Sequence, residues 1–206
     1  MSWLGSDDFD AAVVLKETNS ARLWVEVLRL AKHHVDTGAP LIVTPEQLCR
    51  FNSIAMHGLI SRAGSLRDDD NGIFGAAHKP PPHQAVPQLV DECCAYINRE
   101  HQSPLHPAAY ALWRINFIHP FDDGNGRVSR ALCYLVFCAK AGFMPPGRVA
   151  LPERILARQR AYQNVLADAD RAWVGSHKGR RNHKVSVKNI ETFLDSLIRA
   201  QARDDP

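Results

Sequence analysis

The residues between positions 119 and 130 offer most of the chemistry in this sequence. They read HPFDDGNGRVSR, and two glycines, Gly124 and Gly126, bracket Asn125. Glycine lets the backbone turn tightly with positive φ angles. A stretch that is apolar almost all round follows directly, which is typical of a buried helix. Because the first turn of a helix presents unpaired N–H groups to anions, the segment predicts a turn that can cradle phosphate groups.

The charged side chains of this segment suit the same ligand. Arg127 and Arg130 are three residues apart, so they share one face of the first helical turn. Cations there oppose the helix dipole at a cost of about 0.3–1 kcal/mol each, which a polyanion between them would offset. Asp123 supplies a carboxylate of the kind that holds Mg²⁺ beside phosphates. His119 lies at the rim, where an imidazole can accept a proton near neutral pH. These residues predict phosphoryl or nucleotidyl transfer.

Several other classes of protein are excluded by what the sequence lacks. It contains neither a Walker A motif nor a G-x-G-x-x-G that follows a strand, so neither a P-loop nor a Rossmann site is expected. The net charge of +3, from 25 basic and 22 acidic residues, is too small to predict nucleic-acid binding. The basic run 177–184 is interpreted as a solvated loop, with a patch for nucleic acid or an acidic partner as the alternative.

The sequence also predicts where the protein resides. Its longest apolar stretch, 131–139, is far shorter than the roughly 18 residues that a membrane span needs. The acidic N-terminus lacks the apolar core of a signal peptide. Five cysteines, an odd number, lie mostly in apolar helical patterns, which favours reduced thiols. We therefore expect a cytoplasmic protein that does not bind a membrane.

The elements that must position these residues are mostly helices. Apolar residues at helical spacing predict helices over about 20–33, 44–60, from 87, from 107, 127–141, 152–168 and 187–201. The second of these has Thr44 as its N-cap and Pro45 at its first position. The segment 67–82 differs, because Gly72 and Gly75 flank two apolar residues and three prolines follow, which predicts a short β-hairpin or an extended flap.

The predicted fold is an all-α helical bundle with one short β-hairpin flap. We expect a single domain over residues 1–206, in which about residues 1–35 form an N-terminal helical appendage and residues 36–206 form the core. Arg67, at the start of the flap, is interpreted either as a brace for the flap base or as a surface charge.

The segment 119–130 resembles the signature of the Fic family, H-P-F-x-[D/E]-G-N-G-R-x-x-R, at every fixed position. The resemblance extends more loosely to 106–121, similar to the family's helix before the motif, and to 66–89, similar to its flap and the helix after it. Residues 162–170 are similar to a later helix near the nucleotide base. The resemblance implies a Fic-type helical bundle and the activity of a protein adenylyltransferase.

What the resemblance implies for the motif can be stated residue by residue. His119 would deprotonate a Ser, Thr or Tyr hydroxyl of a target protein, which attacks the α-phosphate of ATP. Asp123 would hold Mg²⁺ between the α- and β-phosphates, and Phe121 would anchor the loop in the core. The other residues implied to bind ATP are Gly124, Asn125 and Gly126 around the phosphates, Arg127 and Arg130 at the β- and γ-phosphates, and Tyr162 beside adenine.

The resemblance also assigns a role to the flap. An extended target segment would pair with the flap as an added strand, through main-chain hydrogen bonds that tolerate many sequences. Ile73 or Phe74 would then clamp the target side chain. The alternative is that both residues simply pack the hairpin onto the bundle.

Many Fic proteins carry an inhibitory glutamate in a motif [S/T]-x-x-x-E-[G/N], and that glutamate pairs with the second arginine of the signature, here Arg130. Glu17 lies at about the right distance upstream, but Val13 and Thr18 depart from the motif. Glu17 is therefore interpreted either as an inhibitory glutamate or as a solvated carboxylate. In the second case an antitoxin-like partner would supply the glutamate, or the enzyme would be unrestrained.

Three alternatives to AMP transfer from ATP stay open at this point. The same fold transfers phosphate, UMP or phosphocholine in relatives of the family, and an intact inhibitory glutamate would also support removal of AMP. The third alternative is a non-enzymatic binding module that keeps a vestigial site. The unbroken motif and the fit of Gly126 and Arg127 to bound ATP favour AMP transfer.

Overall fold

The computed structural model describes residues 6–70, 78–147, 149–175 and 183–203, and every regular element in these ranges is helical. The helices are α1 (Ser6–Thr37), α2 (Pro45–Met56), η1 (His83–Ala85), α3 (Val86–Ile97), α4 (Leu105–Ile118), α5 (Asn125–Ala141), α6 (Leu151–Ala157), α7 (Gln159–Gly175) and α8 (His183–Arg203). The predicted all-α class is confirmed. No β-hairpin is seen in the described part of 67–82, and Ile73 and Phe74 lie outside the described residues.

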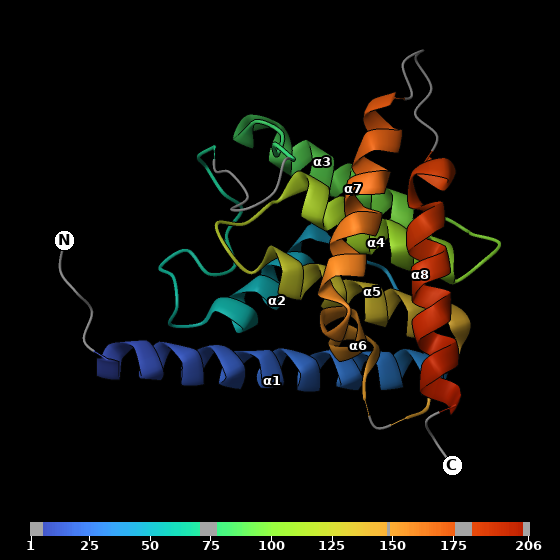
Figure 1. Ribbon diagram of the computed structural model, residues 1–206, viewed down its shortest axis with the longest axis horizontal. Helices are drawn as coiled ribbons and strands as arrows, with labels where there is room; N and C mark the ends of the chain where they lie inside the picture. The colour runs from blue at the N-terminus through green and yellow to red at the C-terminus, as the bar shows by residue number, and fades with distance from the viewer. Residues whose placement is uncertain (1–5, 71–77, 148, 176–182, 204–206) are drawn as a thin grey trace.

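The centre of the bundle is the pair α4 and α5, which pack against each other more extensively than any other two helices of the described chain. Figure 1 shows α1 along one side of this pair and α7 and α8 along another. From Ala131 to Cys138, α5 is buried at every position, because it is apolar on all faces. The start of this central helix is the segment singled out above, so the core itself positions the candidate site.

The first helix is longer than the sequence pattern predicts. It begins at Ser6 and ends before Gly38, whose φ of 67° is the left-handed conformation in which helices commonly terminate. Its second half buries Leu23, Val27 and Ala31 in the core, whereas its N-terminal end extends beyond the other helices (Figure 1). The first half lacks a strict apolar stripe, so periodicity gave no sign of the helix there, although no helix breaker interrupts it.

Other helix boundaries follow the predicted signals in part. The Thr44 hydroxyl accepts a hydrogen bond from the Gln47 N–H at 3.3 Å, which confirms the N-cap. This helix stops at Met56 rather than near residue 60, and Gly58 adopts a positive φ of 69° directly after it. The single helix predicted over 152–168 is two helices, because Arg158 leaves the helical conformation between α6 and α7. None of the helices in the described ranges combines the length and apolar character that crossing a bilayer requires.

Candidate active site

The turn between α4 and α5 is folded by the side chain of Asn125. Its Oδ1 accepts a hydrogen bond from the Phe121 N–H at 2.9 Å, and its Nδ2 donates to the Phe121 carbonyl at 2.8 Å. Asn125 is only 2% exposed, and Phe121 is fully buried, as an anchor of the loop must be. Because the Asn125 side chain is buried and bonds to Phe121 through both of its polar atoms, a ligand at this turn would meet the backbone N–H of Asn125 before its amide group.

Gly124 is required at this turn for two independent reasons. Its φ of 85° lies in the left-handed region that side chains disfavour, and an added Cβ would lie 2.8 Å from Met56 Cγ and 2.9 Å from Asn52 Nδ2. Asn52 is fully buried and ties α2 to the loop, since its Nδ2 donates to the Asp123 carbonyl at 2.8 Å. Its Oδ1 accepts from the Gly64 N–H at 2.9 Å.

Sequence reasoning missed Asn52 as a site residue. A signal was present, because Asn52 is a polar residue four positions after Leu48, on the apolar side of its helix. A buried amide on an apolar face must find hydrogen-bond partners, and here those partners are loop backbone groups.

Replacing Gly124 with alanine should lower the free energy of unfolding by about 2–4 kcal/mol, from backbone strain plus the steric clash. Denaturant unfolding of the purified protein measures this loss. Gly142→Ala is the matched control, because Gly142 also has a positive φ, 73°, but nothing lies within 4 Å of an added Cβ. We expect the control to lose only about 1 kcal/mol. Equal losses in the two variants would contradict the contact described for Gly124.

His119 follows α4 in an unusual backbone conformation. It is the only non-glycine residue with a positive φ in the described chain, at φ 51° and ψ 59°, and its N–H donates to the Ile115 carbonyl at 2.9 Å. Its Nδ1 is buried and has no hydrogen-bond partner among the described residues. Left-handed backbone at a non-glycine residue is uncommon and concentrates at functional sites. The fold therefore fixes the backbone that carries this imidazole beside the turn.

The environment of His119 keeps the imidazole neutral. Burial lowers its pKa to about 4, and the positive charge of Arg67 and the nearby His78 act in the same direction. The carbonyl of Asn116 and the carboxylate of Asp123 oppose the shift without cancelling it. A neutral imidazole can accept a proton, so His119 is available as a general base throughout the physiological range.

The pKa of His119 can be tested directly. A histidine with a lowered pKa stays neutral until the pH falls close to that pKa, so the ring resonances of His119 should titrate with a midpoint well below 6.5. Proton NMR of the folded protein, from pH 8 down to about pH 3 or to the onset of acid unfolding, locates the midpoint or places it below the range in which the protein stays folded, and the spectrum of His119→Ala assigns the signal. A midpoint at or above 6.5 would contradict the environment described here.

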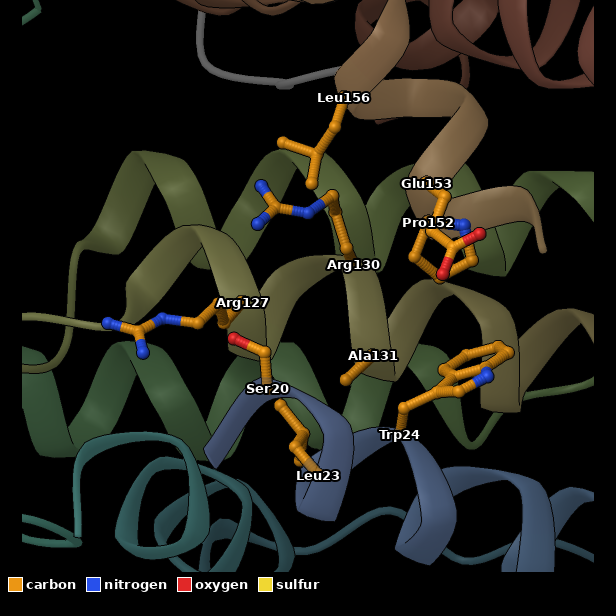
Figure 2. A pocket seen from close by; sticks show the side chains of 9 residues that line it. All are labelled: Ser20, Leu23, Trp24, Arg127, Arg130, Ala131, Pro152, Glu153 and Leu156. Atoms are coloured by element: carbon orange, nitrogen blue, oxygen red, sulfur yellow. The ribbon is translucent and has the colours of Figure 1, made fainter. Parts of the chain in front are cut away.

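The two arginines extend from successive turns of α5 in the same direction (Figure 2). The Arg127 guanidinium donates through Nη1 to the Ala55 carbonyl at 2.7 Å, and its Nη2 lies 2.8 Å from the sulfur of Met56. Arg130 lies deeper, beside the hydroxyl of Tyr162. Burial lowers the pKa of both guanidinium groups, because a buried cation loses part of its hydration. An anion bound close to them would therefore stabilise their charges more strongly than it would at the surface.

Both arginines line one pocket between α1, α5 and α6. The pocket has a volume of about 130 Å³ and is shown in Figure 2. Its lining residues are Ser20, Leu23, Trp24, Arg127, Arg130, Ala131, Pro152, Glu153 and Leu156. The structure thus brings the two predicted phosphate-binding side chains to a common hollow.

Asp123 is the candidate metal ligand, and it is accessible. Its side chain is 60% exposed, its Oδ1 accepts from the Gly124 N–H at 2.5 Å, and its Oδ2 lies 3.8 Å from Arg127 Nη2. It also lines a second hollow together with Lys16 of α1. No group of three or more potential metal ligands occurs among the described residues. A lone carboxylate suits Mg²⁺, which proteins usually bind through one or two carboxylates with the rest of its ligands from phosphates and water.

Tyr162 is buried, and its hydroxyl joins α4 and α5 to α7. It receives a hydrogen bond from Asn116 Nδ2 at 3.0 Å, and Asn116 also donates to the Ser129 hydroxyl at 2.8 Å. Only 6% of the Tyr162 surface is exposed, and its hydroxyl lies close to Arg130. Its predicted position beside adenine stays a prediction. Neither Asn116 nor Ser129 was identified as a site residue from the sequence.

Glu17 lies on the exposed side of α1. Its charge partly opposes the lowering of the Arg127 pKa by burial and has no such effect on Arg130, and it forms no ion pair with Arg130 in the described chain. An inhibitory role for Glu17 stays a prediction.

The sequence of this chain is similar to a known protein family and to several characterised proteins. Residues 42–137 match the sequence model of the Fic/DOC family. The protein adenylyltransferase Fic of Drosophila persimilis is 40% identical over 103 residues, which cover 48% of this chain and 20% of that protein. The protein of the same name from Drosophila melanogaster is 37% identical over 103 residues with the same coverage. The chain therefore spans about a fifth of the length of these curated relatives.

Solved structures share the fold over most of the chain. A Fic domain containing signaling protein from Bacteroides thetaiotaomicron has a TM-score of 0.67 at 19% identity and covers 92% of this chain and 73% of its own. A Fic family protein from Desulfovibrio desulfuricans has a TM-score of 0.62 at 21% identity, with 95% and 62% covered. Fic-1 from C. elegans (aa134 - 508) has a TM-score of 0.58 at 22% identity, with 100% and 56% covered.

Proposed function

The chain contains a Fic family domain, and from this premise we propose that it is a protein adenylyltransferase. It would transfer AMP from ATP to a Ser, Thr or Tyr hydroxyl of a target protein and release diphosphate. The observation that carries the proposal is the junction of α4 and α5. There a neutral imidazole, the N-terminus of a buried helix and two arginines lie within a few residues of each other.

The helix N-terminus supports the binding of a triphosphate. The N–H groups of Asn125 and Gly126 have no acceptor within the described part of the chain, as expected for the first turn of a helix. Because they point out of a 17-residue helix, they add the positive end of its dipole to two guanidinium groups. The absence of a side chain at Gly126 leaves space beside the Arg130 guanidinium, because an added Cβ would crowd Arg130 Nη1 at 3.1 Å.

The transfer step follows from these positions. His119 removes the proton from the target hydroxyl, and the oxygen attacks the α-phosphorus. A new P–O bond forms while the bond to the bridging oxygen of the β-phosphate breaks, and diphosphate leaves with the bonding electrons. The amides of Asn125 and Gly126 stabilise the charge on the α-phosphate, and Arg130 stabilises the charge on the leaving group.

Arg127 and Asp123 would complete the binding of the triphosphate. Arg127 uses two of its five N–H donors on α2, so it can still donate to a phosphate without leaving Ala55. Asp123 would hold Mg²⁺, which supplies additional neutralisation of phosphate charge.

We also propose that the flap binds the target protein. Because Glu17 does not pair with Arg130, we propose that an antitoxin-like protein acts as the inhibitor.

The proposal is tested with purified protein, Mg²⁺ and ATP labelled at either the α- or the γ-phosphate. We expect label from the α-position, and none from the γ-position, on the protein itself or on a protein of an added lysate. Chelation of Mg²⁺ should abolish the signal. Label from the γ-position alone would replace the proposal with phosphoryl transfer, and label from UTP but not ATP would replace the donor. ATP binding without any transfer to lysate proteins would favour a binding module.

A further inference from the structure

The end of α4 is held by residues from the flap base, which we define as 67–70 and 78–83, the described residues on either side of 71–77. Four consecutive carbonyls, those of residues 117–120, accept hydrogen bonds from only two flap-base residues, Arg67 and His78. The last carbonyls of a helix have no intrahelical partner and must be satisfied from outside. Here the flap base supplies that partner at the turn that carries His119.

Arg67 makes most of these bonds. Its Nε donates to the His119 carbonyl at 2.8 Å and its backbone N–H to the Pro120 carbonyl at 2.9 Å, with a weaker contact of 3.5 Å from Nη2 to the Ile118 carbonyl. Nη2 also donates to the Pro81 carbonyl at 2.5 Å. Arg67 is only 3% exposed, so the interpretation as a surface charge is wrong and the interpretation as a brace is confirmed.

His78 completes the set from the other side of the flap. Its Nε2 lies 2.8 Å from the Phe117 carbonyl, and since a carbonyl only accepts, Nε2 carries the proton. The ring lies against Phe117 with centroids 4.6 Å apart, and Nδ1 is 3.7 Å from a carboxylate oxygen of Asp170 on α7. His78 thereby joins the flap base to α4 and to α7.

The two sides of the flap base are also fastened to each other. The Asp70 carboxylate accepts from the His83 N–H at 2.6 Å and lies 3.1 Å from His83 Nδ1. Arg67 spans the same gap, because it donates to the carbonyls of Asp69 and Pro81. Direct hydrogen bonds therefore join the two sides of the flap base to each other and to the α4 turn.

These contacts bear directly on His119. Its left-handed conformation is strained and persists only if the surroundings fix the peptide groups on both sides. The carbonyls of Ile118 and His119 belong to those two peptide groups, and Arg67 contacts both. Small displacements of a catalytic group are costly, because a misplacement of about 1 Å lowers a rate by about 100-fold.

We propose that Arg67 and His78 are positioning residues through which the flap base sets the direction of the His119 imidazole. The catalytic part of this inference rests on the proposed transfer reaction, whereas the structural coupling does not.

The coupling is tested first without any activity measurement, by NMR of the His119 ring and by hydrogen exchange of its amide. Arg67→Lys keeps the charge but cannot span carbonyls on opposite sides. His78→Leu removes the bond to Phe117, whereas His78→Gln can still donate to it. We expect shifted His119 signals and faster exchange in Arg67→Lys and His78→Leu, and wild-type behaviour in His78→Gln and in the control Lys79→Ala, an exposed neighbour.

The second readout is label transfer from ATP. In Arg67→Lys and His78→Leu, kcat should fall about 10- to 100-fold while KM for ATP stays within about twofold, with recovery in His78→Gln. Folded Arg67→Lys and His78→Leu proteins with unchanged His119 signals would overturn the inference, as would changes confined to KM. If Arg67→Lys fails to fold, His78→Leu alone decides. If the wild type transfers no label, the proposed function fails, and the NMR result still decides the coupling.

Discussion

Replacing His119 with alanine should reduce AMP transfer by about 10²- to 10⁴-fold, which is the usual contribution of a general base. The wild-type imidazole is neutral because burial lowers its pKa to about 4, so it is already in the form that accepts a proton. The loss should appear in kcat, since His119 contacts the target hydroxyl rather than the phosphates in the proposed mechanism. Transfer of α-label measures it at saturating ATP.

Two controls separate chemistry from folding in this experiment. Alanine at a φ of 51° is strained, whereas asparagine tolerates the left-handed region, so His119→Asn removes the base with less backbone cost. His33→Ala changes an exposed histidine of α1 and should retain full activity. Substantial transfer by a folded His119→Asn protein would rule out His119 as the general base.

Replacing Arg130 with alanine should lower kcat/KM for ATP by about 10²- to 10³-fold, comparable to removal of a group that stabilises transition-state charge. Arg130 lines the pocket with Arg127 and lies beside the Tyr162 hydroxyl, so its guanidinium is placed to meet an anion there. Arg130→Lys keeps the charge but loses the planar fork, and we expect an intermediate loss. Initial rates at graded ATP concentrations measure both effects.

The matched controls for Arg130 come from its neighbours. Tyr162→Phe removes only the hydroxyl behind the guanidinium and should cost far less than Arg130→Ala. Arg127→Ala should reduce stability as well as activity, because Arg127 donates to the Ala55 carbonyl. Wild-type kinetics in a folded Arg130→Ala protein would remove Arg130 from the site.

Local signals in the sequence predicted the elements that depend on local interactions. The Thr44 cap with Pro45 and the apolar run after Gly126 identified α2 and α5, because caps and periodicity are properties of short segments. The break at Arg158 had no such signal, since neither glycine nor proline marks it. In the structure both helices pack against α8, and α6 also contacts α5 whereas α7 also contacts α4, so the boundary depends on packing that the local sequence does not show.

The candidate site shows the same division. Residues 119–130 could be assigned from the sequence because the turn and the helix that it opens are contiguous. Asn52, Arg67 and Asn116 were not assigned to it, and two of these three reach it from 52 or more residues away. A single sequence does not show which distant polar residues are buried. The sequence left two interpretations of Arg67, and its burial in the structure decided between them.

The use of the Asn125 side chain changes how substitutions in the motif should be understood. Its buried amide closes the turn on Phe121 through both of its polar atoms. A random substitution library of residues 119–130 would therefore lose active clones at position 125 through misfolded turns, and at position 119 through lost chemistry. An intact signature in a related chain is therefore required for folding of the turn as well as for catalysis. A related chain that had lost its catalytic activity would still need Asn125 to fold this turn.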